Sequence, residues 1–363
     1  MEGDWALGLL DLSTKALGPL SLPGGWCVFD GLICQGTKAV LIAGRAEAPS
    51  AALMLDIQPD QPDAVAETVL RHSADIEFAP GAISRAQKTA FPSTLPSGDS
   101  VQAFGYFYPP ASAEFQAPEG ERPPLIVMSH GGPTGQTSAA FSLKVQFWTS
   151  RGFAVLDVNY GGSTGYGRAY RRRLNGAWGL VDVADCAAGA LYLAAKGLVD
   201  RDRLVTVGGS AGGYTTLAAL TFRDVFRAGR SSYGIGDLET LARDTHKFES
   251  RYLDTLVGPW PAAADTYRAR SPIRHADGLN CPVIFLQGED DKVVPPNQAE
   301  EMVKVLRTKG LPVAYILFEG EGHGFRRAES IKRAFEAELS FYAQLFGFTP
   351  ADAIEAVEIE NLG

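Results

Sequence analysis

From Leu125 onward, apolar segments of strand length alternate with amphipathic segments of helix length. The strand-like segments are PLIVMSH, FAVLDVNY, RLVTVGG, PVIFLQG and VAYILFEG. Strands that are apolar along their whole length need cover on both faces, which helices of a doubly wound fold provide. The alternation therefore predicts a mostly parallel α/β sheet. In such sheets, ligands bind beyond the carboxyl ends of the strands.

The chain before this region has a different pattern. WCVFDGLICQ, KAVLIAG, AALMLDI and VQAFGYFY are short and β-like, and turn residues separate them. PPASAEFQAPEGERPP then has the composition of an exposed proline-rich loop. We expect a β-rich region at residues 1–118 and an α/β domain at residues 119–363.

Charge and composition exclude several classes of function. The net charge is −9 and the acidic residues are scattered, which disfavours binding to nucleic acid or to an anionic membrane. No apolar stretch reaches the length of about 18 residues that a membrane helix needs. The N-terminal segment MEGDWALGLLDLSTK is acidic where a secretory signal is basic. We expect a cytoplasmic protein, while a homo-oligomer remains open.

Cofactor and metal motifs are missing from the sequence. The glycine-rich segment GGSTGYG (161–167) lacks the Gly-Lys-Ser/Thr ending of a phosphate loop, and no HExxH occurs. The four cysteines form no CxxC pair and lie near no histidine at metal-ligand spacing. The sequence therefore predicts no cofactor, no metal and reduced thiols.

One glycine-rich turn has the pattern of a nucleophile elbow. Gly208-Gly209-Ser210-Ala211-Gly212 directly follows the segment RLVTV and precedes a predicted helix. Glycines on both sides of Ser210 allow a sharp turn that raises the hydroxyl above the sheet. Ser210 is the predicted nucleophile, and the N–H of Ala211 is a predicted oxyanion donor.

A serine nucleophile needs a general base and an acid that orients it. Among five histidines, His323 is the candidate base because it lies in a glycine-flanked loop, EGEGHGF, just after a predicted strand. The acid should lie between serine and histidine in chain order, on a loop after a strand. Glu289, Asp290 and Asp291 all meet that condition, and this logic does not choose between them.

The remaining histidines suit other roles. His72, His246 and His275 are expected to be structural or solvated. His130 opens the segment His130-Gly131-Gly132-Pro133 after a predicted strand, where glycines let backbone N–H groups approach a carbonyl oxygen. We expect a backbone N–H of this segment to be the second oxyanion donor.

Taken together, the ordered motifs resemble the prolyl oligopeptidase family of serine peptidases, in particular its acylaminoacyl-peptidase and dipeptidyl-peptidase-like branches. They are SHGGP, DVNYGGSTGYG, WGLVDV, GGSAGGY, GEDDKVVPPNQAE and GEGHGFR, and the likeness extends over nearly all of residues 122–348. The resemblance implies an α/β-hydrolase fold and cleavage of short peptides through an acyl-enzyme. It also places the catalytic acid at Asp290. Some relatives have an oxyanion tyrosine where this chain has His130, so the resemblance favours the backbone N–H of Gly132 as the second oxyanion donor. Lys292 would contact a substrate carbonyl, and Val293 and Phe248 would line the pocket for the residue before the scissile bond.

The region before the hydrolase motifs departs from that family's pattern. Family members carry an N-terminal β-propeller, but about 120 residues leave room for two to three blades at most. The resemblance therefore implies a partial propeller, either because the chain is the C-terminal part of a longer protein or because the propeller has been reduced. A carboxylesterase with the same triad, and a non-catalytic binding or oligomerisation fragment, remain as alternatives.

Overall fold

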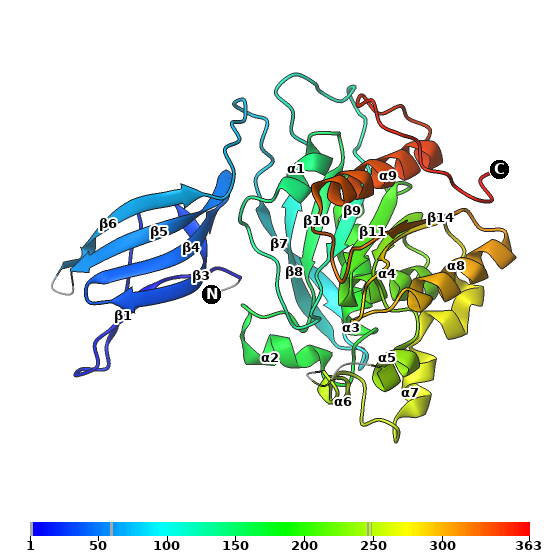
Figure 1. Ribbon diagram of the computed structural model, residues 1–363, viewed down its shortest axis with the longest axis horizontal. Helices are drawn as coiled ribbons and strands as arrows, with labels where there is room; N and C mark the ends of the chain where they lie inside the picture. The colour runs from blue at the N-terminus through cyan, green and yellow to red at the C-terminus, as the bar shows by residue number, and fades with distance from the viewer. Residues whose placement is uncertain (1–2, 59–60, 245–246, 248) are drawn as a thin grey trace.

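The computed structural model describes residues 3–58, 61–244, 247 and 249–363 (Figure 1). Near the N-terminus, a hairpin of β1 (Gly8–Leu10) and β2 (Leu17–Pro19) precedes a four-stranded antiparallel sheet. The strands of that sheet, in spatial order, are β3 (Trp26–Gln35), β4 (Lys38–Arg45), β5 (Ala48–Gln58) and β6 (Gln61–His72). Four antiparallel strands in sequential order are the unit of a propeller blade.

The N-terminal sheet has a small core of its own. Alternate residues of β4, namely Ala39, Leu41 and Ala43, are buried, and the residues between them face solvent. They pack with Leu53 and neighbouring apolar side chains in one cluster. This period of two is the signature of a sheet with one covered face, and it confirms the β-rich character expected here.

The second part of the chain is an eight-stranded mixed sheet in the order β14-β13-β12-β11-β9-β10-β8-β7. Its antiparallel edge consists of β7 (Gln87–Thr94) and β8 (Ser100–Tyr108). The six parallel strands are β9 (Leu125–Ser129), β10 (Ala154–Asn159), β11 (Leu204–Gly209), β12 (Ala228–Ser232), β13 (Val283–Gly288) and β14 (Val313–Phe318).

Strands β7 and β8 belong to the large sheet, so the boundary between the two parts lies earlier in the chain than expected. We placed residues up to 118 in the β-rich region, but β8 pairs with β10 over Phe104–Tyr108, so the α/β part begins before β7. An antiparallel edge strand and a blade strand both alternate with period two, so their sequences do not separate them. The proline-rich segment after β8 contains no helix or strand, as expected.

Helices cover both faces of the large sheet (Figure 1). They are α1 (Leu143–Thr149), α2 (Gly167–Arg171), α3 (Val181–Ala195), α4 (Ala211–Phe222), α5 (Leu238–Asp244), α6 (Tyr252–Leu256), α7 (Ala264–Ala269), α8 (Asn297–Lys309) and α9 (Ala328–Phe346), with 3₁₀ helices η1 (Arg172–Leu174) and η2 (Pro272–Gly278). Helices α1 and α9 pack on one face, and α3, α4 and α8 pack on the other.

The central strand shows why the sheet is doubly wound. Every residue of β9 is buried. Leu125 and Val127 face the α3–α4–α8 layer, whereas Ile126 and Met128 face the α1–α9 layer. This arrangement confirms the predicted α/β-hydrolase class and brings the loops that follow the parallel strands to one edge of the sheet.

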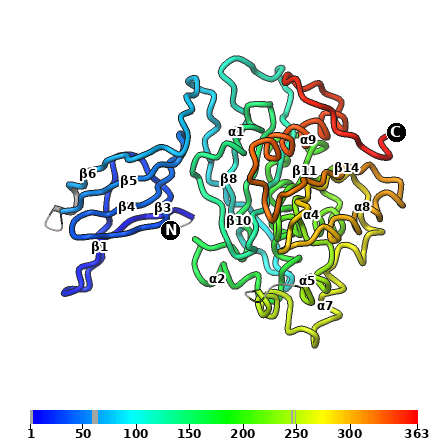
Figure 2. The backbone as a smooth tube through the Cα atoms, in the orientation of Figure 1, coloured from blue at the N-terminus to red at the C-terminus, as the bar shows by residue number. Residues whose placement is uncertain are grey.

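The backbone trace shows the N-terminal sheet beside the α/β part (Figure 2). The two parts contact where the N–H of Phe141 donates to the carbonyl of Arg45 (2.8 Å) and where Gly3 N–H donates to Gly165 O (3.2 Å). Among the described residues, no helix is long and apolar enough to cross a membrane.

Candidate active site

Ser210 occupies the sharp turn between β11 and α4. Its φ of 56° lies in the left-handed region, which non-glycine residues rarely adopt. The Ser210 N–H donates to the carbonyl of Ser232 at the end of the neighbouring strand (3.0 Å). The strained turn directs the side chain away from the sheet at the carboxyl end of the strand, as a nucleophile elbow requires.

Close backbone packing explains the two glycines that flank this turn. A Cβ atom on Gly208 would lie 2.1 Å from the carbonyl oxygen of Gly212, and a Cβ on Gly212 would lie 2.2 Å from Ser129 O. Both contacts are with backbone atoms, which cannot rotate away. Glycine is therefore required at both positions because β9, β11 and the start of α4 approach so closely.

A continuous line of hydrogen bonds joins three side chains at this edge. His323, between β14 and α9, has Nε2 2.9 Å from Ser210 Oγ and Nδ1 2.8 Å from Asp291 Oδ2. A carboxylate only accepts hydrogen bonds, so Nδ1 carries the proton and Nε2 is free to accept the hydroxyl proton of Ser210. The structure therefore brings together the nucleophile and base expected from the sequence.

The expectation that Asp290 orients the base is wrong. Asp290 and Glu289 are exposed, whereas the Asp291 carboxylate is fully buried. Asp291 Oδ1 also accepts the N–H groups of Val293 and Val294, each at 2.9 Å. These bonds turn the second aspartate inward and leave the first one in solvent.

The loop after β9 passes directly beside the elbow. A Cβ on Gly131 would lie 3.7 Å from Ser210 Cβ, and Gly132 has a φ of 118°. Ala211 N–H, at the first position of α4, donates to no described residue. The two predicted oxyanion donors, Gly132 and Ala211, are therefore on segments that flank Ser210.

His130 holds this loop, and its hydrogen bonds are with Gly131, Tyr160 and Ser163 rather than with Ser210. Its Nδ1–H donates to Gly131 O (2.9 Å), so Nε2 accepts from the Ser163 hydroxyl (2.7 Å). Burial lowers the pKa of His130 to about 4, so the ring is neutral near neutral pH. The buried Tyr160 stacks on this ring and donates its hydroxyl to His130 O and Pro133 O, each at 2.9 Å.

Two buried carboxylates, which the sequence analysis did not single out, support the loops around the site. Asp182 accepts the Gly179 N–H and the Thr215 hydroxyl on α4, each at 2.6 Å. Asp185 accepts the Gly161 N–H at 2.7 Å. Burial raises the pKa of each aspartate to about 6. The sequence did carry a signal for these two residues, because both are aspartates within helix α3, which is otherwise almost entirely apolar.

The residues expected to bind substrate have separate outcomes. Lys292 is exposed and makes no hydrogen bond or ion pair with a described residue. Val293 is half-buried and packs against the core on the α3–α4–α8 side. Phe248 lies outside the described residues.

The remaining histidines lie away from the Ser210 hydrogen bonds or outside the described residues. His246 is outside them, His72 is exposed, and the ring of His275 lies 5.4 Å from that of Phe222.

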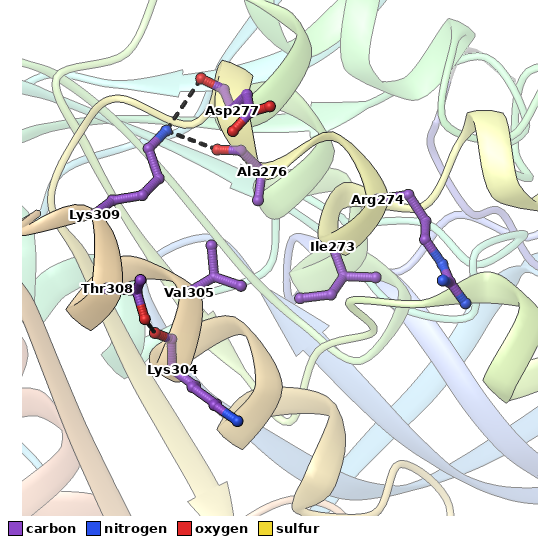
Figure 3. Close-up of a pocket in the computed structure, with 8 residues that line it drawn as sticks. All are labelled: Ile273, Arg274, Ala276, Asp277, Lys304, Val305, Thr308 and Lys309. Atoms are coloured by element: carbon purple, nitrogen blue, oxygen red, sulfur yellow. Dashed lines mark hydrogen bonds between the residues drawn. The ribbon is translucent and has the colours of Figure 1, made fainter.

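A separate surface cavity of about 440 Å³ lies between η2 and α8 (Figure 3). Lys309 crosses one side of it and donates to the carbonyls of Ala276 (2.8 Å) and Asp277 (3.0 Å). None of its lining residues belongs to the Ser210 site. In the described part of the chain, no group of three or more His, Cys, Asp or Glu side chains could hold a metal ion.

Comparison with curated proteins finds relatives that are peptidases by name. Dipeptidyl aminopeptidase BIII of Pseudoxanthomonas mexicana is 32% identical over 265 residues, which are 71% of this chain and 38% of the relative. Dipeptidyl peptidase family member 6 of Caenorhabditis elegans is 29% identical over 290 residues, which are 73% of this chain and 39% of the relative. The chain thus spans less than two-fifths of these relatives.

Solved structures match nearly the whole chain. A puromycin hydrolase superposes with a TM-score of 0.91 at 42% identity, and a Mycobacterium tuberculosis puromycin-hydrolyzing peptidase with 0.92 at 44%. Each match covers 99% of this chain and 53% of the other. The Pyrococcus horikoshii acylaminoacyl peptidase shares the fold, with a TM-score of 0.73 at 24% identity.

The family model described as "Prolyl oligopeptidase family" matches residues 139–349, a segment that contains the elbow, the His323 loop and Asp291. This match covers more than half of the chain. The chain therefore belongs to the prolyl oligopeptidase family.

Proposed function

We propose that this chain carries the catalytic site of a serine peptidase that hydrolyses short peptides, with Ser210 as nucleophile, His323 as general base and Asp291 as orienting acid. The observation that carries the proposal is the unbroken line from the buried Asp291 carboxylate through His323 to the strained Ser210 elbow. A buried acid, an imidazole and an activated hydroxyl in this order form the machinery of acyl transfer.

The proposed reaction follows from the positions of the protons. Ser210 Oγ attacks the substrate carbonyl while its proton moves to His323 Nε2, and Asp291 stabilises the imidazolium. The N–H groups of Gly132 and Ala211 donate to the developing oxyanion. His323 then protonates the leaving amine, which leaves an acyl group on Ser210. Water activated by the same imidazole hydrolyses that ester.

The comparisons support three classes of short substrate: aminoacyl, acylaminoacyl and dipeptidyl. Relatives are named dipeptidyl aminopeptidase and acylamino-acid-releasing enzyme, and two matching structures are of proteins that hydrolyse puromycin. Contacts of Lys292, Val293 and Phe248 with the substrate stay predictions. The cytoplasmic location also stays a prediction, to which the four free cysteines add support. A homo-oligomer remains open.

The test is a comparison of kcat/KM on aminoacyl, acylaminoacyl and dipeptidyl p-nitroanilides, puromycin and p-nitrophenyl butyrate, with the full chain. We expect turnover of at least one amide class. The variant Ser210→Ala should lower kcat by about a millionfold, as nucleophile deletion does in other triads. Substantial activity in that variant would show that the nucleophile is misassigned. Cleavage of the ester alone would support the carboxylesterase alternative instead.

A further inference from the structure

Tyr233 has an unusual backbone conformation next to the site. It directly follows β12, and its φ of 38° is positive, which among described non-glycine residues is shared only by Lys15, Ser210 and Asn361. A bulky side chain in this region costs about 1–2 kcal/mol. Its N–H donates to Leu286 O (2.8 Å), so β13 holds the strained residue in place. Strain of this kind persists only where the surroundings enforce it, and it points to a functional role.

The Tyr233 ring lies between the histidine loop and the nucleophile strand. Its centroid is 4.9 Å from that of the His323 ring, at an interplanar angle of 62°. On the same loop, the Phe325 ring lies 5.5 Å away at 87°. A Cβ on Gly209 would come within 2.9 Å of the tyrosine ring, so the ring rests directly on the residue that precedes Ser210.

Hydrogen bonds alone leave one motion of the imidazole unrestrained. Asp291 holds Nδ1 and Ser210 holds Nε2, on opposite sides of the ring. Tilting about the line that joins these two contacts changes neither distance much. It does change the direction in which Nε2 points relative to an attacking or leaving atom. Packing against the ring must supply this restraint, and an edge-to-face aromatic contact does so.

We infer that Tyr233 is a positioning residue that fixes the tilt of the His323 ring. The inference rests on the proposed function, because it concerns the same Ser210–His323 pair. The aromatic ring performs this role, and the tyrosine hydroxyl is not needed for it. The positive φ of Tyr233 is the backbone conformation that brings the ring from the end of β12 over Gly209 to the imidazole.

The test uses two substitutions that separate the ring from the backbone. Tyr233→Gly removes the ring and suits the positive φ, and Tyr233→Phe keeps the ring. For Tyr233→Gly we expect kcat to fall by about 10- to 100-fold at nearly unchanged KM, which is the cost of a misplaced catalytic group. Ser210 should also react more slowly with a fluorophosphonate, by a similar factor. Tyr233→Phe should stay within about twofold of wild type.

Two further variants control for folding. Lys15→Gly places glycine at another positive φ, in the β1–β2 hairpin, and should leave both rates unchanged. Tyr233→Leu keeps an apolar side chain without an aromatic ring, and its kcat should also fall. Melting temperatures of all variants are recorded, and rates are measured well below them.

Each outcome has one meaning. Unchanged kcat and unchanged labelling rate in Tyr233→Gly, or a loss expressed only in KM, would overturn the role of Tyr233. A kcat of Tyr233→Phe far below that of wild type would overturn the claim that the ring performs this role without the hydroxyl. Wild-type labelling of Ser210 without cleavage of any peptide or amide would contradict the peptidase proposal alone, because labelling tests only the Ser210–His323 pair.

Discussion

The Asp291 carboxylate lies 2.8 Å from His323 Nδ1, while the side chain of the adjacent Asp290 is in solvent. Replacing Asp291 with Asn presents an amide group to Nδ1 and favours the tautomer whose proton is on Nε2. That tautomer cannot accept the Ser210 proton, so Asp291→Asn should lower kcat by about 10⁴-fold. Steady-state kinetics on the best amide substrate measure the loss.

Asp290→Asn is the matched control for this prediction. It makes the same chemical change one residue away, at an exposed position, and should alter kcat by less than about twofold. A large loss in Asp290→Asn together with full activity in Asp291→Asn would contradict the assignment made from the geometry.

The sequence was sufficient for the elbow but not for the acid. GGSAGG between an apolar strand and a helix identifies Ser210, because few other turns need glycine on both sides of a serine. Glu289, Asp290 and Asp291 share one short loop, and which of them faces inward depends on the backbone bonds from Val293 and Val294. Sequence patterns locate a loop to within a few residues, so they do not resolve such a difference.

Strand β12 is not among the strands predicted from the sequence, for a different reason. Its sequence, AGRSS, contains an arginine and two serines, yet all five residues are buried. The strand is possible because the Arg230 guanidinium pairs with Glu338 on α9, more than 100 residues later in the chain. A tertiary contact of this range compensates for polar side chains that, by local pattern alone, would indicate a loop.

Gly212→Ala should distort the elbow. The new Cβ would lie 2.2 Å from Ser129 O and 3.1 Å from His130 O, so the start of α4 must move away from the oxyanion loop. We expect a loss of about 1–3 kcal/mol in the free energy of unfolding and a lower kcat. Gly18→Ala is the control, because nothing lies within 4 Å of its Cβ, and it should change neither quantity. Wild-type kcat in Gly212→Ala would show that the backbone contact relaxes freely.

The buried pair of Arg230 and Glu338 should be more costly to break than to replace. Arg230 also donates to Gly208 O (3.1 Å) and to the Ser232 hydroxyl (2.9 Å). Glu338→Leu leaves a buried guanidinium without its counter-charge and should destabilise the fold by about 3–5 kcal/mol. The double variant Arg230→Met/Glu338→Leu should recover part of that loss, as measured by urea unfolding. A double variant less stable than Glu338→Leu would contradict this expectation.

Tyr160→Phe should weaken the oxyanion hole. It removes the hydroxyl that donates to His130 O and Pro133 O, on either side of Gly132. Complete removal of an oxyanion donor costs about a hundredfold to a thousandfold, so a displaced donor should lower kcat by about tenfold. Tyr170→Phe is the matched control, because it removes another buried donor, to Asn159 O (2.6 Å), but no hydrogen bond to residues 130–133. Both variants lose stability, but kcat should fall only in Tyr160→Phe.

The last prediction concerns stability against pH. Burial raises the pKa of Asp185 to about 6 from a value of 3.8 in the unfolded chain. Between these pH values the folded protein binds more protons than the unfolded chain does. The contribution of this carboxyl to stability is therefore greatest below pH 3.8 and is lost as pH rises through about 6. Asp185→Asn removes the titration. The stability of wild type relative to the variant should therefore decline by up to about 3 kcal/mol across that window.

Asp11→Asn supplies a control of opposite sign. The hydrogen bond from the Ser13 hydroxyl and the N–H groups of Thr14 and Ser13 lower the pKa of Asp11 to about 2. Its contribution is present above pH 3.8 and is lost only as pH falls toward 2, so the relative stability of Asp11→Asn should stay flat where that of Asp185→Asn changes. Urea unfolding at several pH values between 4 and 7 separates the two. The stability difference between wild type and Asp185→Asn could instead stay constant from pH 4 to pH 7. That result would contradict the prediction and would mean that the Gly161 N–H and the Ser93 hydroxyl fully replace the lost hydration of the Asp185 carboxylate.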